Sequence, residues 1–300
     1  MGFERYTPTP EKETFHGMHP ELLRNVYQKA EAILKREAVD PTSFRDIYSQ
    51  EEIDDDLQKT KERSVAFAKS RKENDALHKA SYGTEALILE QIGLSGWLSA
   101  EGVKVYVEKT AESDDVFNKT DLVLTFEMPG LEEPLAITVD VTIGLQALSE
   151  KIHSIKQEID TKTLGQVKYH ETIAGEHKPL EQTPRVLIGI DPSELKQLFT
   201  LWTSEDKAVR DRLKTHPLQK TIVYEIQEQL LAYQKYAREK GDTKVAENYD
   251  GLILILQKVR EGKDEQFEGR EETDTRHLDM LRTALRSQLM VIGEKSSDRK

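Results

Sequence analysis

The spacing of apolar residues changes from helical to alternating near residue 103, and this change limits the folds open to the chain. Valines alternate with polar residues over 103–108, which predicts a strand with one solvated face. Two further stretches of strand length follow at 121–126 and 135–142, and Pro129 with Gly130 turns the chain between them. Because short connections join these consecutive strands, we expect an antiparallel meander.

A long helix and a fourth strand extend this meander. Apolar residues at helical spacing predict a helix from about 146 to 172, and the apolar run 185–190 has the length of a strand. Asp191 and Pro192 are typical of the first residues of the next helix. The third strand, the helix and the fourth strand then form a crossover unit. With the apolar helix expected at about 74–100, the order is helix, three strands, helix, strand, which predicts an α/β fold with a mixed sheet.

Helices are expected on both sides of this unit. An amphipathic helix opens at His19-Pro20 and ends before Asp40-Pro41, and a charged helical stretch covers about 49–71. Beyond the unit, the pattern predicts an antiparallel helix pair at 221–238 and 245–259, a charged linker at 260–273 and a helix at about 276–292. We therefore expect an N-terminal helical arm over 1–73, a core over 74–204 and a C-terminal helical region packed on the core over 205–300.

The charge and the composition limit the classes of function. Acidic residues outnumber basic ones by 55 to 43, so a nucleic-acid partner needs a local basic patch because the average field repels phosphate. The chain has no cysteine, which excludes disulfides and cysteine-based metal or nucleophilic sites. Apolar stretches are too short for a signal peptide or a membrane span, so we expect a cytoplasmic protein without a membrane partner.

Two aspartates stand out within the predicted meander. Asp121 begins the second strand, and Asp140 lies near the end of the third, a strongly apolar strand where an unpaired charge is costly. If these strands form a hairpin, both carboxylates reach one end of the sheet. Together with the carbonyl of Val141, they offer the hard oxygen ligands that Mg²⁺ prefers. The alternative is that Asp121 is a turn residue at the strand entry and Asp140 pairs with a lysine.

This arrangement resembles the core of the PD-(D/E)XK superfamily, the restriction-endonuclease-like fold. The matching residues are Thr120-Asp121 for the first half of the motif and Asp140-Val141-Thr142 for the second. The resemblance covers about 110 residues and implies an αβββαβ core, a Mg²⁺ or Mn²⁺ site and hydrolysis of nucleic acid. It also implies an acidic metal ligand on the first core helix, for which Glu85 is the match and Glu90 the alternative.

The position of the family's lysine holds Thr142, whose hydroxyl carries no charge. In the family, that lysine positions the attacking water and stabilises charge in the transition state. Lys151 and Lys156 flank the apolar stripe of the following helix on opposite sides, and either is a candidate replacement. Lys119, beside the second strand, is a third. Each has the alternative of an ordinary solvated lysine.

Other sequence motifs give weaker evidence of a functional site. His170 and His177 fall at a helix end and in a loop, where polar surface residues are the simpler interpretation. The chain has no P-loop, no dinucleotide-binding glycine pattern, no HExxH and no GxSxG. Trp97 and Trp202 are expected in the core.

Three functions fit these observations. The first is a Mg²⁺-dependent nuclease acting on DNA or RNA, with Asp121, Asp140 and Glu85 at its centre. The second is a nuclease-like fold, impaired in catalysis, that binds nucleic acid or protein. The third is a helical interaction protein in which the sheet is a structural insert. The C-terminal helices either cover the sheet or form a homodimer interface, and the sequence leaves both open.

Overall fold

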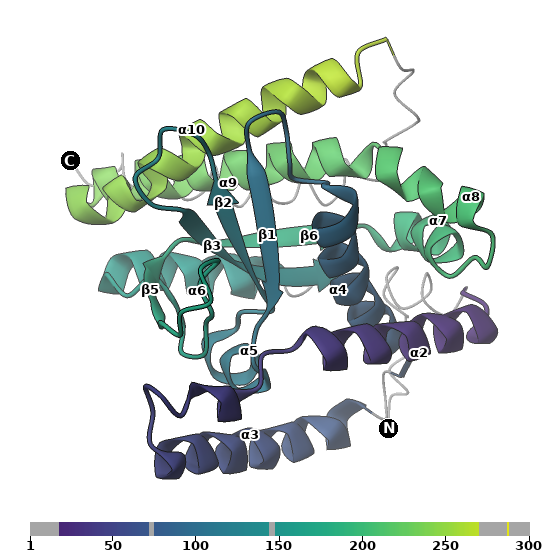
Figure 1. Cartoon of the computed structure of the whole chain (residues 1–300), viewed down its shortest axis with the longest axis horizontal. Coiled ribbons are helices and arrows are strands. Elements are labelled where there is room, and N and C mark those ends of the chain that lie inside the picture. The colour runs from purple at the N-terminus through teal and green to yellow at the C-terminus, as the bar shows by residue number, and fades with distance from the viewer. Residues whose placement is uncertain (1–17, 72–74, 144–147, 270–286, 288–300) are drawn as a thin grey trace, which may run out of the picture.

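The four strands predicted from the sequence form one mixed sheet in the order β1-β2-β3-β6 (Figure 1). The computed structural model describes residues 18–71, 75–143, 148–269 and residue 287. Strands β1 (Lys104–Lys109), β2 (Leu122–Glu127) and β3 (Leu135–Ile143) are antiparallel neighbours, and β6 (Arg185–Ile190) runs parallel to β3. The predicted meander and the crossover are confirmed, and the protein is mixed α/β.

Two helices frame this sheet, as the apolar periodicity predicts. Helix α4 (Asp75–Ser95) precedes β1 and packs against β1 and β3. Helix α6 (Leu148–Thr161) makes the crossover and buries the predicted stripe of Leu148 and three isoleucines. Helix α4 ends at Ser95 rather than near residue 100 because Gly96 adopts a left-handed φ of +63°.

The two N-terminal helices lie below the sheet in the view of Figure 1. Helix α2 (Pro20–Glu37) begins after His19, whose ring accepts a hydrogen bond from the Glu21 amide, and it packs along α4. A 3₁₀ turn, η1 (Pro41–Phe44), leads into α3 (Gln50–Arg71), which packs against α5 (Glu112–Asn118).

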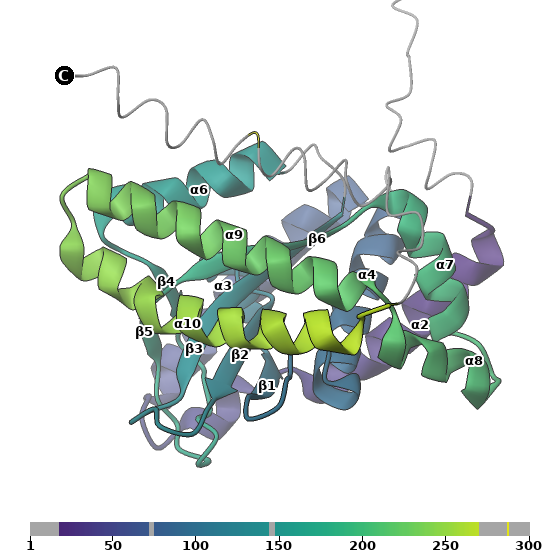
Figure 2. The same cartoon turned by 90° about the horizontal axis from the view of Figure 1, so that it is seen from above.

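The C-terminal helices lie across the sheet. Helix α7 (Pro192–Trp202) starts at the predicted cap, where Asp191 accepts a hydrogen bond from the Ser193 amide at 2.8 Å. After α8 (Lys207–Asp211) and η2 (Arg212–Thr215) come α9 (Leu218–Glu239) and α10 (Thr243–Gln266), which lie side by side (Figures 1 and 2). The predicted antiparallel pair around Gly241 is confirmed.

Helix α9 also covers the free edge of the sheet. Strand β6 is an outer strand, and the backbone of Leu187 has no strand partner on that side. The side-chain amide of Gln229 takes this place, accepting from the Leu187 amide at 2.8 Å and donating to its carbonyl at 2.8 Å. An exposed edge would pair with other chains, so this contact stabilises the fold and blocks that pairing.

The predicted helix at 146–172 is too long. Helix α6 stops at Thr161, where Lys162 has a left-handed φ of +59°, and a small hairpin of β4 (Gly165–Val167) and β5 (Leu180–Thr183) follows. The error has a physical source, because buried Leu164 and Val167 continue the apolar spacing of the helix at nearly helical intervals.

The structure also differs from, or does not cover, three smaller expectations. The connection between the first two strands, expected to be short, contains helix α5, whose acidic first turn suits the positive end of the helix dipole. The expected linker from 260 is the last part of α10, which continues to Gln266. The helix expected at 276–292 lies outside the described residues, apart from residue 287.

One continuous cluster of buried side chains extends from α2 through the sheet to α10. Trp97 and Trp202 are both almost fully buried in it, as expected, and their indole N–H groups donate to the Leu213 carbonyl and the Glu90 carboxylate. Within the described ranges, no helix is both long enough and apolar enough to cross a membrane.

Candidate functional site

Asp121 is fixed at one end of the sheet by its own backbone. Its amide donates to the Val139 carbonyl at 2.9 Å, and its carbonyl accepts from the Thr110 amide at 3.2 Å, so it bridges the ends of β1 and β3. The β2–β3 register pairs Leu122 with Val139, which puts Asp121 opposite Asp140. One carboxylate oxygen of Asp121 accepts from the Val141 amide at 2.6 Å. The two predicted aspartates therefore meet at one end of the hairpin.

Asp140 is buried in β3, with 6% of its surface exposed, and a lysine reaches it. The ammonium group of Lys151, on the first turns of α6, donates to Asp140 Oδ1 and, at 3.3 Å, to the Val141 carbonyl. Lys151 is one of the three replacement lysines predicted from the sequence. Thr142, at the position of the family's lysine, is itself buried.

Glu85 and Lys109 form a second ion pair beside the aspartates. Lys109 is the last residue of β1, and its Nζ lies 2.9 Å from Glu85 Oε1 on α4, with side-chain exposures of 8% and 12%. The same ammonium donates to the Asp121 carbonyl at 3.2 Å and lies 3.5 Å from Asp115 Oδ2.

Lys109 was missed at the level of sequence. It continues the inward-facing series Val103, Val105, Val107 at the same spacing of two. A lysine on the buried face of a strand needs a carboxylate partner, because burial otherwise penalises its charge. The place of Lys109 in this alternation is therefore the sequence feature that indicates a buried lysine with a carboxylate partner.

Burial controls the ionisation of the carboxylates. Loss of water raises the pKa of Glu85, of Asp121 and of Asp140, and nearby carboxylates add to the rise at Glu85 and Asp121. The ion pairs with Lys109 and Lys151 oppose the rise at Glu85 and Asp140 respectively. Burial opposes charge on Lys109 as well, but the surrounding carboxylates outweigh it and raise the pKa of this lysine. The site therefore concentrates negative charge around fixed cations.

These side chains open into a cleft of about 960 Å³. Its floor carries the residues described above together with Arg185, which donates to the Ser154 hydroxyl at 3.0 Å and pairs with Glu158. Its rim is built by α2, α3, α4, α5 and α6. Basic side chains from these helices line it despite the net charge of −12.

Three other predicted candidates lie elsewhere or at the margin. Lys156 directs its ammonium over the Tyr236 ring, 5.1 Å from the centroid, and is absent from the cleft wall. Lys119 reaches the rim, where it donates to the Ser154 hydroxyl at 3.2 Å. Glu90, also on α4, does not line the cleft and pairs with Lys29 at 3.5 Å.

The two histidines do not share a site. His170 pairs with Glu108 at 3.0 Å, whereas His177 pairs with Asp46 at 2.7 Å and stacks on Phe44.

The oxygen atoms at this end of the sheet suit a hard divalent cation. Asp121, Asp140 and the Val141 carbonyl are the ligand types of Mg²⁺, and Glu85, ion-paired with Lys109, is a buried carboxylate close by. In the described part of the chain, no three acidic or histidine side chains are spaced to share an ion as they stand. The ammonium groups of Lys109 and Lys151 lie against two of the three carboxylates.

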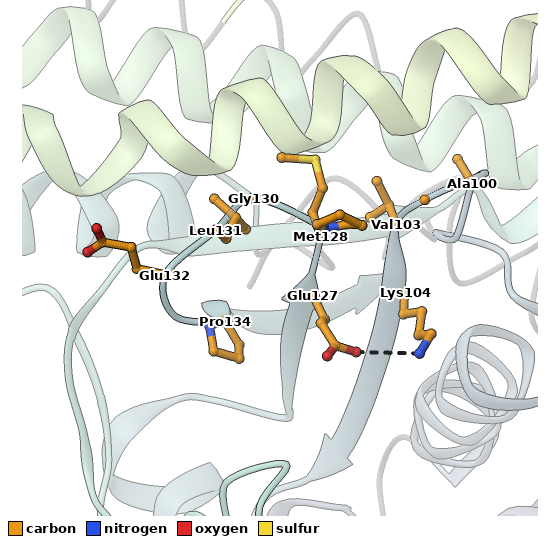
Figure 3. A pocket seen from close by; sticks show the side chains of 11 residues that line it. Ala100, Val103, Lys104, Glu127, Met128, Gly130, Leu131, Glu132 and Pro134 are labelled. Carbon is orange, nitrogen blue, oxygen red and sulfur yellow. Dashed lines mark ion pairs between the residues drawn. The ribbon is translucent and has the colours of Figure 1, made fainter.

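A second hollow, of about 470 Å³, lies at the opposite end of β1 and β2 (Figure 3). The β2–β3 turn and the start of β1 line it, including Met128, Gly130 and Leu131. Lys104 and Glu127 pair across its mouth at 3.7 Å. It gathers no set of acidic groups comparable with that of the larger cleft, so the larger cleft is the candidate site.

Comparison of the chain with protein-family models, with curated proteins and with solved structures finds no match.

Proposed function

We propose that this chain is a Mg²⁺-dependent nuclease with a divergent restriction-endonuclease-like core. The order α4, β1, β2, β3, α6, β6, interrupted by α5 after β1 and by the β4–β5 hairpin after α6, supports the αβββαβ assignment. The meeting of Asp121 and Asp140 at one end of the hairpin supports the metal site implied by the sequence resemblance. A divalent cation there would polarise a phosphodiester and lower the pKa of an attacking water molecule.

The observation that carries this proposal is the position of Lys151. Its ammonium group donates to Asp140 Oδ1 and to the Val141 carbonyl, two of the proposed metal ligands. A positive charge brought from α6 therefore replaces the one that Thr142 lacks. From that point, Lys151 donates to the attacking water or to a phosphate oxygen that gains charge in the transition state.

The other residues have supporting roles. Asp121 and Asp140 hold the cation, with the Val141 carbonyl as a neutral ligand. Glu85 supports it from α4, directly or through water. Lys109 is too enclosed to reach the substrate freely and instead keeps Glu85 and the Asp121 backbone in place.

A second candidate is a nuclease-like fold that binds nucleic acid or protein without cutting. The specific observation in its favour is that two lysines already neutralise Glu85 and Asp140, so these carboxylates are balanced without a metal. The two candidates differ in whether a divalent cation displaces the lysine contacts.

Calorimetric titration with Mn²⁺ and Mg²⁺ tests the proposal, combined with a cleavage assay on single-stranded and duplex DNA and RNA. The parent protein should bind metal and cut one of these substrates. Asp121→Asn and Asp140→Asn should lose both properties, whereas Glu127→Gln, at the opposite end of β2, should keep both. Metal binding that survives both aspartate substitutions would overturn the site, and metal-independent binding of nucleic acid without cleavage would favour the second candidate.

A further inference from the structure

One face of α4 leads from the candidate metal site to the mouth of the cleft. His78, Tyr82 and Glu85 are spaced four and three residues apart, so they lie on the same side of the helix, and all three line the cleft. At about 1.5 Å of rise per residue, Tyr82 is roughly 4–5 Å along the axis from Glu85 and His78 roughly 10 Å. These two rings therefore lie within one or two nucleotides of the proposed reaction centre.

The rings form an aromatic platform with a third residue from α2. Tyr27 and Tyr82 stack with centroids 5.6 Å apart and planes 29° apart. His78 lies 5.9 Å from Tyr27 and 5.6 Å from Tyr82, with tilted planes. We use the term aromatic platform for Tyr27, His78 and Tyr82. All three are only partly buried, so the platform is not sealed inside the core.

Cations stand around the same opening. Arg63 of α3, Lys35 of α2 and Lys119, which follows α5, line the cleft and are exposed. The Arg63 guanidinium also lies 5.2 Å from the Phe117 ring, which joins α3 to α5 across one side of the cleft. The rim thus offers positive charge from three separate segments, interspersed with the exposed Glu31, Glu112 and Glu150, while the floor combines buried carboxylates with Lys109 and Lys151.

We propose that the cleft takes single-stranded nucleic acid, with one base stacked on Tyr82 and the backbone phosphates against Arg63, Lys35 and Lys119. This inference rests on the proposed nuclease function and names its substrate class. Aromatic rings beside a line of cations are the combination that binds single strands without reading their sequence. A duplex keeps its base faces stacked on each other and offers none to Tyr82, so the platform selects strands with unpaired bases.

Fluorescence anisotropy tests this proposal without depending on cleavage. The probes are labelled oligothymidylate, oligouridylate and a blunt DNA duplex of equal length, measured in EDTA so that no strand is cut. The parent should bind the single strands at least roughly ten-fold more tightly than the duplex, and their affinity should fall with added salt. The two single-stranded probes distinguish DNA from RNA as the preferred ligand.

Variants locate the contact. Tyr82→Leu should weaken single-strand binding by roughly 10-fold or more, and Tyr82→Phe should restore it, because stacking needs the ring and not the hydroxyl. Tyr106→Leu is the matched control, since Tyr106 is an exposed tyrosine on β1 outside the cleft. Arg63→Gln changes an exposed side chain, so it should keep the fold, weaken binding and reduce the salt dependence of binding.

The outcomes separate the two proposals. If Tyr82→Leu and Arg63→Gln both bind single strands like the parent, or if the duplex binds as tightly, the single-strand proposal is overturned whatever the cleavage assay gives. If binding depends on Tyr82 but the protein cuts no substrate with Mg²⁺ or Mn²⁺, the nuclease function fails and the single-strand site stands.

Discussion

Lys109 and Glu85 form an ion pair inside the protein, with 2.9 Å between Nζ and Oε1, and this contact ties the last residue of β1 to α4. Removing one partner leaves the other charge buried without compensation, which typically costs about 3–5 kcal/mol. We expect Lys109→Met to lower the free energy of unfolding by that amount in urea titrations. Lys104→Met, at the exposed start of the same strand, should change it by about 1 kcal/mol or less.

The double variant Lys109→Met/Glu85→Met gives the control for this pair. With both charges replaced by apolar side chains, most of the lost stability should return. If the double variant is no more stable than Lys109→Met alone, then Asp115 and the Asp121 carbonyl, rather than Glu85, are the main partners of this lysine.

Lys151 and Lys156 provide a matched pair on α6, because only Lys151 contacts the candidate site. Lys151→Met should lower kcat by roughly 100-fold or more, as expected for loss of a group that stabilises transition-state charge. The same variant should bind Mn²⁺ at least as tightly as the parent, since Asp140 is released from its ion pair. Lys156→Met should leave both quantities nearly unchanged. Equal losses of activity in the two variants would remove Lys151 from the mechanism.

The sheet was predictable because each strand carries its own local signal. Alternation identifies β1, and the apolar runs identify β2, β3 and β6, whose residues are buried on both faces. The β4–β5 hairpin was not predictable, because its buried residues continue the spacing of α6 and only the left-handed Lys162 separates them. The local spacing of apolar residues does not reveal that the helix ends there.

The residues of the candidate site were also predictable only in part. Asp121 and Asp140 were predictable because each is a charged residue at the boundary of, or within, an apolar strand. Lys109 was overlooked because a lysine at the end of a half-solvated strand is normally exposed. Its burial depends on α4 bringing Glu85 across the sheet, which is a tertiary contact. Choosing Lys151 over Lys156 also required the rotation of α6 against β3.

Divalent metal should stabilise the folded protein if the proposed site is correct. Ligands that bind only the native state add RT ln(1 + [L]/Kd), about 2.7 kcal/mol when free metal is about 100 times its Kd. We expect the Tm to rise on adding Mg²⁺ and to fall back when EDTA removes it. Asp121→Asn should abolish the rise, and potassium at matched ionic strength should not reproduce it. An equal rise in the variant would mean that the metal binds elsewhere.

Gly83 permits the close crossing of α2 over α4. A Cβ atom at this position would lie 2.2 Å from Val26 Cγ1 and 3.1 Å from Phe199, closer than van der Waals contact allows. Gly83→Ala should therefore lower the free energy of unfolding by roughly 1–3 kcal/mol, as overpacking does, despite the better helix propensity of alanine. Adding Val26→Ala removes the clashing methyl, so the double variant should lose less stability than the sum of the single variants. Additive losses would contradict the clash.

His216 should make the protein sensitive to mild acid. Burial, with Arg212 nearby, lowers the pKa of this histidine from 6.5 to about 4, although Glu194 Oε1 lies 3.4 Å from its Nε2. Its Nδ1 accepts from the Leu218 amide, and its ring stacks on Trp97. The unfolded chain takes up the proton near pH 6.5 and the folded one only near pH 4, so the folded state is favoured above that window and loses stability as pH falls through it.

The loss amounts to roughly 3 kcal/mol across the window, at about 1.4 kcal/mol for each unit of pKa. Urea unfolding measured from pH 7 to pH 4 should show this loss in the parent in excess of that in His216→Gln, because the raised pKa values of Glu85, Asp121 and Asp140 act in the opposite direction in both proteins. His216→Gln keeps an acceptor for the Leu218 amide but has no proton to gain, so its stability should depend less on pH over the same interval. His153→Gln, on the exposed side of α6, is the control and should retain the parental slope. If His216→Gln also retains it, the acid sensitivity comes from another group.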